Sequence, residues 1–190
     1  ADLHSKRQMR RLLQGDVGSG KTVVAVFAIY AAVTAGYQAA LMVPTEILAQ
    51  QHFAKIDELL KPLGVRVALL TGDTKDLEKK EIYRELADGT INVVIGTHAL
   101  IQKDVHFKNL GLVIIDEQHR FGVNQRNTLI KKGDAPDILA MTATPIPRTL
   151  ALTVYGDMAV SEIRHLPKGR KPVVSSWATS SKLREVLDLM

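Results

Sequence analysis

Residues 12–24 read LLQGDVGSGKTVV, and this stretch decides how the chain folds around it. Its central part, Gly15 to Thr22, is a glycine, four further residues and then Gly-Lys-Thr, the pattern of a phosphate-binding P-loop. The glycines of such a loop let main-chain N–H groups point at phosphate oxygens, and the helix that follows directs its positive end at them. An apolar run precedes the loop and helical spacing follows it, which favours a P-loop over a chance glycine-rich turn.

The P-loop predicts a nucleotide site, with ATP and Mg²⁺ as the expected cofactors. Lys21 would supply a full positive charge to the β- and γ-phosphates, and the hydroxyl of Thr22 is placed to bind Mg²⁺. The expected nucleotide-binding residues are Gly15, Asp16, Val17, Gly18, Ser19, Gly20, Lys21 and Thr22.

Short apolar runs alternate along the chain with longer segments of helical spacing. Several runs are apolar at nearly every position, which is typical of strands covered on both faces. The expected strands are Met9–Gln14, Ala39–Pro44, Val65–Thr71, Asn92–Thr97, Leu110–Asp116 and Ile138–Thr142. The expected helices are Lys21–Thr34, Glu46–Leu60, Asp76–Asp88, Asn124–Lys132 and Pro147–Tyr155. This alternation predicts an α/β fold, a doubly wound parallel sheet whose ligands bind at the carboxyl ends of the strands.

An acidic pair, Asp116 and Glu117, directly follows the apolar run that begins at Leu110. Two carboxylates at the end of a buried strand are costly unless a cation or a polar partner uses them. Asp116 is therefore expected to hold Mg²⁺, and Glu117 to orient or deprotonate an attacking water. The alternative is an ordinary helix N-terminus, where acidic residues are also favoured. With a P-loop in the same chain, the expected catalytic residues are Lys21, Asp116 and Glu117.

Composition excludes several other classes of protein. The 190 residues contain no cysteine, so disulfides and thiol chemistry are absent, and the six histidines lack the spacing of a transition-metal site. No apolar run approaches the ~20 residues of a membrane span, so a cytoplasmic protein without a membrane partner is expected. The net charge of +5 is a mild bias toward polyanions such as nucleic acid.

The chain is expected to hold one domain and part of another. Residues 1–160 form the P-loop domain in this interpretation. A stretch rich in proline, glycine and positive charge, Leu166–Pro172, indicates a linker. Residues 161–190 are accordingly expected to be this linker and the truncated start of a second lobe.

Four further segments complete a recognisable set: Pro44-Thr45-Glu46, Thr71-Gly72, Gly96-Thr97-His98 and Thr142-Ala143-Thr144-Pro145. With the P-loop and Asp116-Glu117-Gln118-His119, they resemble the first motor domain of superfamily 2 helicases, a RecA-like P-loop NTPase domain. The strings LQGDVGSGKT (13–22), DEQHRFGV (116–123) and MTATPIPR (141–148) look like the RecG family of bacterial branched-DNA helicases. A transcription-repair coupling translocase is the near alternative, and it usually has Glu where Gln118 stands.

The resemblance implies roles for residues whose chemistry the spacing alone does not fix. Residues that couple the nucleotide state to domain movement would be Gln118, His119, Thr142 and Thr144. Residues that contact nucleic acid would be Pro44, Thr45, Thr71, Gly72, Thr97 and His98. Small hydroxyls and main-chain N–H groups suit contacts with phosphates that do not read the base sequence. Each of these residues could instead be a simple strand end or turn, and their recurrence at strand ends favours the functional role.

The family resemblance implies an ATP-dependent DNA helicase or translocase that acts on stalled forks and Holliday junctions in recombination and repair. Its partners would be branched or duplex DNA and the second motor and wedge domains of the same protein. Because the trans-acting arginines belong to the second motor domain, we expect this chain to bind ATP and hydrolyse it weakly. The adenine-reading glutamine motif of the family is not matched by Gln8 or Gln14, and no role is assigned to Arg120, Arg126 or Arg148.

Two other functions are weighed against the helicase. A transporter ATPase, small kinase or GTPase would share the P-loop, but the chain has neither a Leu-Ser-Gly-Gly-Gln string nor an Asn-Lys-x-Asp guanine reader. A non-catalytic nucleic-acid module would need aromatic side chains on which bases stack. Aromatic residues make up only 5% of the chain and are scattered along it, so this alternative is less favoured.

Overall fold

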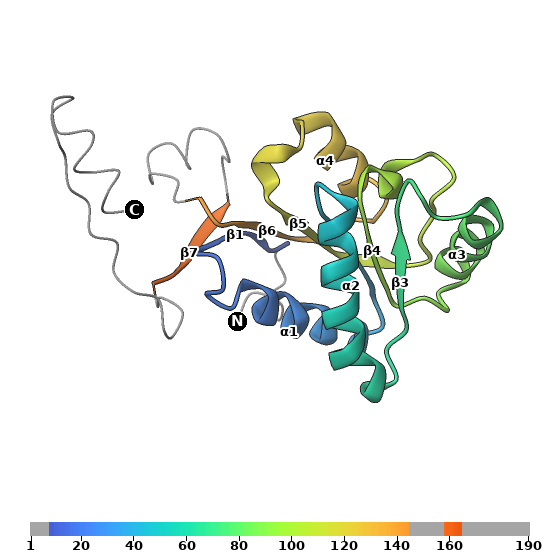
Figure 1. Ribbon diagram of the computed structural model, residues 1–190, viewed down its shortest axis with the longest axis horizontal. Coiled ribbons are helices and arrows are strands. Elements are labelled where there is room, and N and C mark those ends of the chain that lie inside the picture. The colour runs from blue at the N-terminus through green and yellow to red at the C-terminus, as the bar shows by residue number, and fades with distance from the viewer. Residues whose placement is uncertain (1–7, 145–157, 165–190) are drawn as a thin grey trace, which may run out of the picture.

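The computed structural model describes residues 8–144 and 158–164, and these residues form a single parallel sheet covered by helices (Figure 1). The sheet has seven strands in the order β3-β4-β2-β5-β6-β1-β7. Every pair of neighbouring strands is parallel. The predicted doubly wound parallel α/β fold is therefore confirmed.

The elements follow the expected alternation closely. The strands are β1 Arg10–Gly15, β2 Gln38–Met42, β3 Val67–Leu70, β4 Val93–Gly96, β5 Leu110–Asp116, β6 Asp137–Thr142 and β7 Ala159–Ile163. The helices are α1 Lys21–Thr34, α2 Glu46–Leu60, α3 Asp76–Asp88 and α4 Val123–Ile130, with short 3₁₀ turns at Lys61–Leu63, His98–Ile101 and Gln118–Arg120. The expected helix Pro147–Tyr155 and all expectations for residues 165–190 lie outside the described residues.

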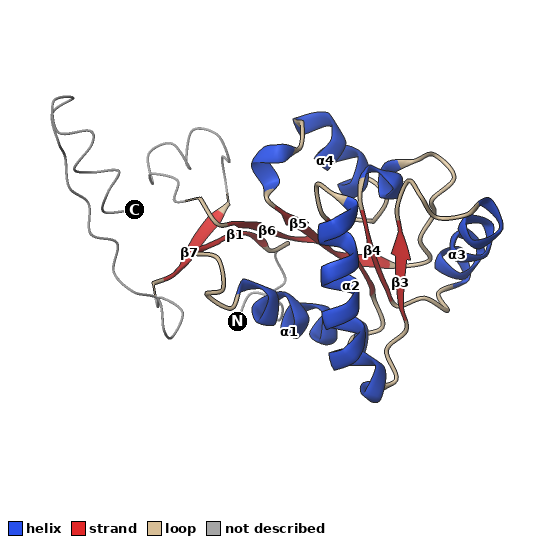
Figure 2. Cartoon of the chain, viewed as in Figure 1, coloured by secondary structure: helices blue, strands red, loops and turns tan. Residues whose placement is uncertain are grey.

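Helices cover both faces of the sheet (Figure 2). Alternate residues of the strands contribute to two separate apolar cores, one on each face. In β2, Ala39 and Leu41 pack with α1 and α2, whereas Ala40 and Met42 pack with α3 and α4. Because both faces are covered, all five residues of β2 are buried. This explains why the strands read as continuous apolar runs in the sequence.

Strand β7 is the element that the sequence patterns did not predict. It pairs with β1 at the edge of the sheet, where Gln14 lies opposite Glu162 and Gly15 lies opposite Ile163. Its residues are at most half-buried, so the strand carries no continuous apolar signal. The sheet of the P-loop domain extends to Ile163, and the expected boundary after residue 160 falls within this strand.

Candidate nucleotide and nucleic-acid site

The residues singled out from the sequence gather at one edge of the sheet. Because all the strands are parallel, their carboxyl ends share this edge, and the strand order sorts the residues into two groups. Thr71, Thr97 and Pro44 follow the neighbouring strands β3, β4 and β2. Asp116, Thr142 and the P-loop stand at the ends of β5, β6 and β1. The expected nucleic-acid group and the expected nucleotide group thus meet where β2 lies beside β5.

The P-loop has the tight turns that its glycines predict. Gly18 and Gly20 have φ values of +78° and +99°, in the left-handed region that strains residues with a side chain. At Gly15 the limit is space, because a side-chain carbon there would come within 2.5 Å of the Ser19 hydroxyl and 3.1 Å of Ile163 Cβ. The loop then passes directly into α1, for which Gly20 is the N-cap residue.

Lys21 is folded back onto the loop that precedes it. Its Nζ donates hydrogen bonds to the carbonyl oxygens of Gly15 at 2.6 Å and Asp16 at 2.9 Å. The positive charge therefore lies within the P-loop, where the phosphates of a nucleotide are expected. Thr22 follows in the first turn of α1 and is half-buried.

The acidic pair ends β5 in a strained turn. Asp116 is the last residue of the strand and is 9% exposed. Glu117 has φ 47° and ψ 49°, a left-handed conformation that is uncommon for a residue with a side chain and that often marks functional sites. The main-chain N–H of Glu117 donates to Asp116 Oδ1 at 3.0 Å. This hydrogen bond holds the Asp116 carboxylate against the turn at the strand end.

His52 is a residue of the site that the sequence patterns did not identify. Its Nε2 lies 3.0 Å from Asp116 Oδ2, and both side chains are 12% exposed. The two residues are 64 positions apart in the chain, so no local motif connects them. The signal that could have found His52 is its place among apolar residues on the sheet-facing side of α2, where a polar side chain needs a partner.

The four residues expected to couple nucleotide state to movement lie in two segments, the turn Gln118–Arg120 and the end of β6. His119 Nδ1 is 3.5 Å from Glu117 Oε2, so His119 adjoins the acidic pair. The hydroxyls of Thr142 and Thr144 are 2.8 Å apart at the end of β6. Gln118 is 1% exposed, and it lines a separate hollow of about 190 Å³ to which no P-loop residue contributes.

Burial divides the six residues expected to contact nucleic acid. Thr71 and Thr97 are only 4% and 2% exposed, so their side chains contribute little surface. Pro44 is half-buried, whereas Thr45, Gly72 and His98 are exposed. The hydroxyl of Thr45 also accepts a hydrogen bond from the main-chain N–H of Leu48 at 3.3 Å, and it therefore caps the start of α2.

The donor atoms at the nucleotide end of the edge fit Mg²⁺. Thr22 offers a hydroxyl oxygen and Asp116 a carboxylate, the hard oxygen ligands that this ion prefers. In residues 8–144 and 158–164, no cluster of three or more His, Cys, Asp or Glu residues could hold a metal alone. Two oxygen ligands from the protein are enough for Mg²⁺ in a nucleotide site, because phosphates and water complete its coordination.

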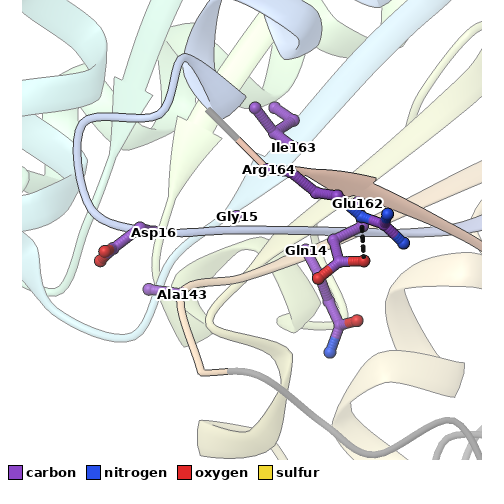
Figure 3. Close-up of a pocket in the computed structure, with 7 residues that line it drawn as sticks. All are labelled: Gln14, Gly15, Asp16, Ala143, Glu162, Ile163 and Arg164. Carbon is purple, nitrogen blue, oxygen red and sulfur yellow. Dashed lines mark hydrogen bonds and ion pairs between the residues drawn. The ribbon is translucent and has the colours of Figure 1, made fainter. Parts of the chain in front are cut away.

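A hollow of about 330 Å³ adjoins the P-loop between the ends of β1, β6 and β7 (Figure 3). Its lining residues are Gln14, Gly15, Asp16, Ala143, Glu162, Ile163 and Arg164. The Nε of Arg164 donates to Glu162 Oε2 at 3.1 Å, so these two charges offset each other. Asp16 also lines the hollow, so the hollow adds no net positive charge for binding phosphate, and the P-loop itself remains the anion-binding part of the site.

A P-loop at the end of β1 and an acidic pair at the end of β5, on a doubly wound parallel sheet, define a RecA-like P-loop nucleotide-binding domain. The model of the DEAD/DEAH box helicase family matches residues 2–153, and the chain belongs to this family. It is 61% identical to the ATP-dependent DNA helicase RecG of Streptococcus pneumoniae over 98% of this chain and 27% of that protein. It is 56% identical to the ATP-dependent DNA helicase RecG of Synechocystis over 100% of this chain and 23% of that protein.

Solved structures agree with this assignment. The structure of RecG bound to a three-way DNA junction matches with a TM-score of 0.82 and 52% identity, over 99% of this chain and 25% of that chain. The helicase MrfA bound to DNA matches with a TM-score of 0.64 at 19% identity, over 82% of this chain and 25% of that chain, which shows a shared fold. The chain thus spans about a quarter of the length of the RecG proteins that it resembles. In its described part, no helix is both long and apolar enough to cross a membrane.

Proposed function

We propose that this chain is the ATP-binding first motor lobe of an ATP-dependent DNA helicase or translocase that remodels branched DNA. The observation that carries this proposal is the strand order, which places the expected nucleotide residues after β5, β6 and β1 and the expected nucleic-acid residues after β3, β4 and β2. One sheet would then position both the nucleotide and the nucleic acid on which a motor domain acts. The identity to RecG helicases, one of them solved with a three-way DNA junction, supports branched DNA as the partner. The same identity to RecG helicases favours this function over that of a transcription-repair coupling translocase.

The residues of the nucleotide group have separate tasks in this proposal. Lys21 and the main-chain N–H groups of the P-loop bind the β- and γ-phosphates, and Thr22 and Asp116 hold Mg²⁺. Held by these two residues, Mg²⁺ would supply positive charge that offsets the negative charge developing during phosphoryl transfer. Glu117 orients the attacking water and accepts its proton, a role suited to a carboxylate held at a fixed strand end.

The remaining expected residues act between the two ligands. His119, beside Glu117, and the hydroxyl pair of Thr142 and Thr144 would lie next to the reacting phosphate and respond to its loss. The exposed residues Thr45, Gly72 and His98 would contact the DNA backbone. Gln118 faces a hollow away from the P-loop, so any part it has in coupling would pass through the turn that it shares with His119.

Full activity would require the rest of a protein of RecG length, which includes a second motor lobe and a wedge domain. An arginine supplied across such a lobe interface accelerates P-loop enzymes by about 10³–10⁵-fold. We therefore expect the 190-residue chain to bind ATP and to hydrolyse it feebly. Near-full turnover by this chain that is lost in Lys21→Ala would contradict this part of the proposal.

Calorimetric titration of the chain with Mg²⁺-ATP tests the proposal first. The parent chain should bind, Lys21→Ala should not, and Lys55→Ala on an exposed position of α2 should bind as the parent does. GTP as a competitor measures base selectivity, which is expected to be low because the glutamine motif is not matched. Absence of Mg²⁺-ATP binding by the parent chain, or undiminished binding by Lys21→Ala, would overturn the nucleotide assignment.

A further inference from the structure

We propose that His52 is a positioning residue for Asp116, and that Mg²⁺-dependent nucleotide binding consequently depends on helix α2. This inference rests on the proposed function, in which Asp116 holds the metal ion. His52 itself would contact neither metal nor nucleotide. Its contribution would be to fix the orientation of the carboxylate before either arrives.

The geometry around Asp116 leaves its carboxylate little freedom. Oδ2 lies 3.0 Å from His52 Nε2, and Oδ1 accepts the main-chain N–H of Glu117 at 3.0 Å. A carboxylate oxygen accepts hydrogen bonds, so the proton of the first contact belongs to Nε2 of the ring. One carboxylate oxygen is held by the turn that follows β5, and the other is held by α2. Together the two contacts fix the orientation of the carboxylate plane.

Helix α2 presents His52 to the sheet for reasons visible in its sequence. The buried residues of the helix are Ala49, Ile56 and Leu60, and Phe53 packs partly against the same core. Positions three, four and seven apart lie on one helical face, so His52 shares the face of Ala49 and Ile56. Directed at the sheet among apolar neighbours, the imidazole needs a polar partner, and Asp116 at the end of β5 provides one.

Helix α2 adjoins the nucleic-acid group, and the His52–Asp116 contact therefore connects that group to the nucleotide group. The helix begins at Glu46, just after Pro44 and Thr45 in the nucleic-acid group, and packs against β3 and β4. Through His52 it contacts the nucleotide group at Asp116. Among the hydrogen bonds of the described residues, this one joins the helix of the first group to the acidic pair of the second.

The His52–Asp116 contact is shielded from solvent, and its loss is therefore expected to have a larger effect on Mg²⁺-dependent nucleotide binding. Both side chains are 12% exposed, and hydrogen bonds that involve a charged group are stronger where water is excluded. Partners that orient a metal-binding side chain typically change metal affinity about 10–100-fold when they are removed. A loss of this size in Mg²⁺-dependent nucleotide binding is therefore expected without His52.

The test compares three variants of the 190-residue chain by calorimetric titration with the non-hydrolysable analogue AMP-PNP, with Mg²⁺ and with EDTA. His52→Leu fills similar space on an apolar face and cannot donate a hydrogen bond. His52→Gln retains an amide N–H close to the position of Nε2. Gln51→Leu is the matched control, since Gln51 is the exposed neighbour on the same helix.

In His52→Leu, affinity with Mg²⁺ should fall about tenfold or more, whereas affinity in EDTA should stay within about threefold of the parent. His52→Gln and Gln51→Leu should keep most of the Mg²⁺ effect. Retention of the full Mg²⁺ effect in a folded His52→Leu chain overturns the inference, as does an equal loss with and without Mg²⁺, which would indicate a general disturbance. If His52→Leu does not unfold cooperatively, His52→Ala takes its place. Lys21→Ala separates the two proposals, because undiminished binding in that variant contradicts the nucleotide site itself.

Discussion

The carbonyl oxygen of Leu70 in β3 lies so close to Gly96 in β4 that a side-chain carbon at Gly96 would come within 2.0 Å of it. The two residues are direct neighbours in the ladder between these strands. The same carbon would also lie 3.1 Å from the side chain of Leu100. Glycine is therefore required here by the approach of two strands, at the position that leads into Thr97 and His98.

Gly96→Ala should accordingly destabilise the fold, since a main-chain carbonyl in a fully buried strand cannot move aside. The expected loss in free energy of unfolding is about 1–3 kcal/mol or more, the range for overpacked cores. Gly72→Ala, in the turn after β3, is the control. There the added carbon would meet Glu46 Oε1 at 2.9 Å, the far end of a flexible side chain that can move aside. Urea unfolding of both variants measures the difference, and equal losses would contradict the explanation.

Glu117→Gln should separate nucleotide binding from hydrolysis. The amide keeps the size and the left-handed conformation of Glu117 but cannot accept the proton of water. Affinity for Mg²⁺-ATP is expected to stay within about threefold of the parent, while single-turnover hydrolysis falls about 10²-fold or more, as for loss of a general base. Asp116→Asn provides the contrast, because there the Mg²⁺ dependence of binding should be lost. Unchanged hydrolysis in Glu117→Gln would exclude Glu117 as the base.

Much of this fold could be predicted because its signals are local. The runs that became β2 and β5 are apolar at nearly every position, and the helices coincide with segments of helical spacing such as Glu46–Leu60. Strand β7 was missed because it lies at the sheet edge, where half-exposed residues give no apolar run. Its place beside β1 depends on pairing between residues about 150 positions apart, such as Arg11 and Ala159, and on a side-chain hydrogen bond from Arg11 to Ser161.

The motifs of the candidate site could be recognised because they are local in the sequence, and His52 was missed because its contact depends on packing. Gly15 to Thr22 and the acidic pair are contiguous motifs whose chemistry can be read from residue type and spacing. His52 is paired with Asp116 only through the packing of α2 on the sheet, and a lone histidine carries no such information. The strand order, which sorts the motifs into two groups along the edge, is likewise a property of the folded chain alone.

The pKa of Asp88 gives a prediction about pH. Hydrogen bonds from the hydroxyl and main-chain N–H of Thr90 hold the pKa of this carboxyl below its usual range, with smaller contributions from Arg84 and Lys108. A pKa that is lower in the folded than in the unfolded chain stabilises the fold above the unfolded value, about 3.9. This contribution is lost as the pH falls through the folded value.

Thr90→Val removes the hydroxyl and keeps the main-chain donor, which lies 2.8 Å from Asp88 Oδ1. The pKa of Asp88, followed by NMR titration, should rise toward its ordinary value in this variant. Thr128→Val is a control in which another threonine loses a hydroxyl, one that bonds the carbonyl of Asn124 instead. An Asp88 titration that is identical in Thr90→Val and the parent would contradict this origin of the shift.

Binding of DNA by the proposed nucleic-acid group should depend strongly on salt. The exposed residues Thr45, Gly72 and His98 suit phosphate contacts. Lys79 adds charge at this place, because its Nζ donates to the carbonyl of Gly72 at 3.0 Å. Each phosphate neutralised by a lysine contributes about −0.9 to the slope of log affinity against log salt for duplex DNA.

Lys79→Ala should therefore weaken binding of a branched duplex and make that slope shallower by about one. Lys131→Ala removes an exposed charge at the end of α4 and should leave the slope unchanged. Fluorescence anisotropy across a series of salt concentrations measures both. If Lys79→Ala and Lys131→Ala alter the slope equally, the lysine acts through net charge rather than at a defined contact. Affinity that does not change with salt would contradict phosphate recognition altogether, since contacts with bases and apolar surfaces release few counterions.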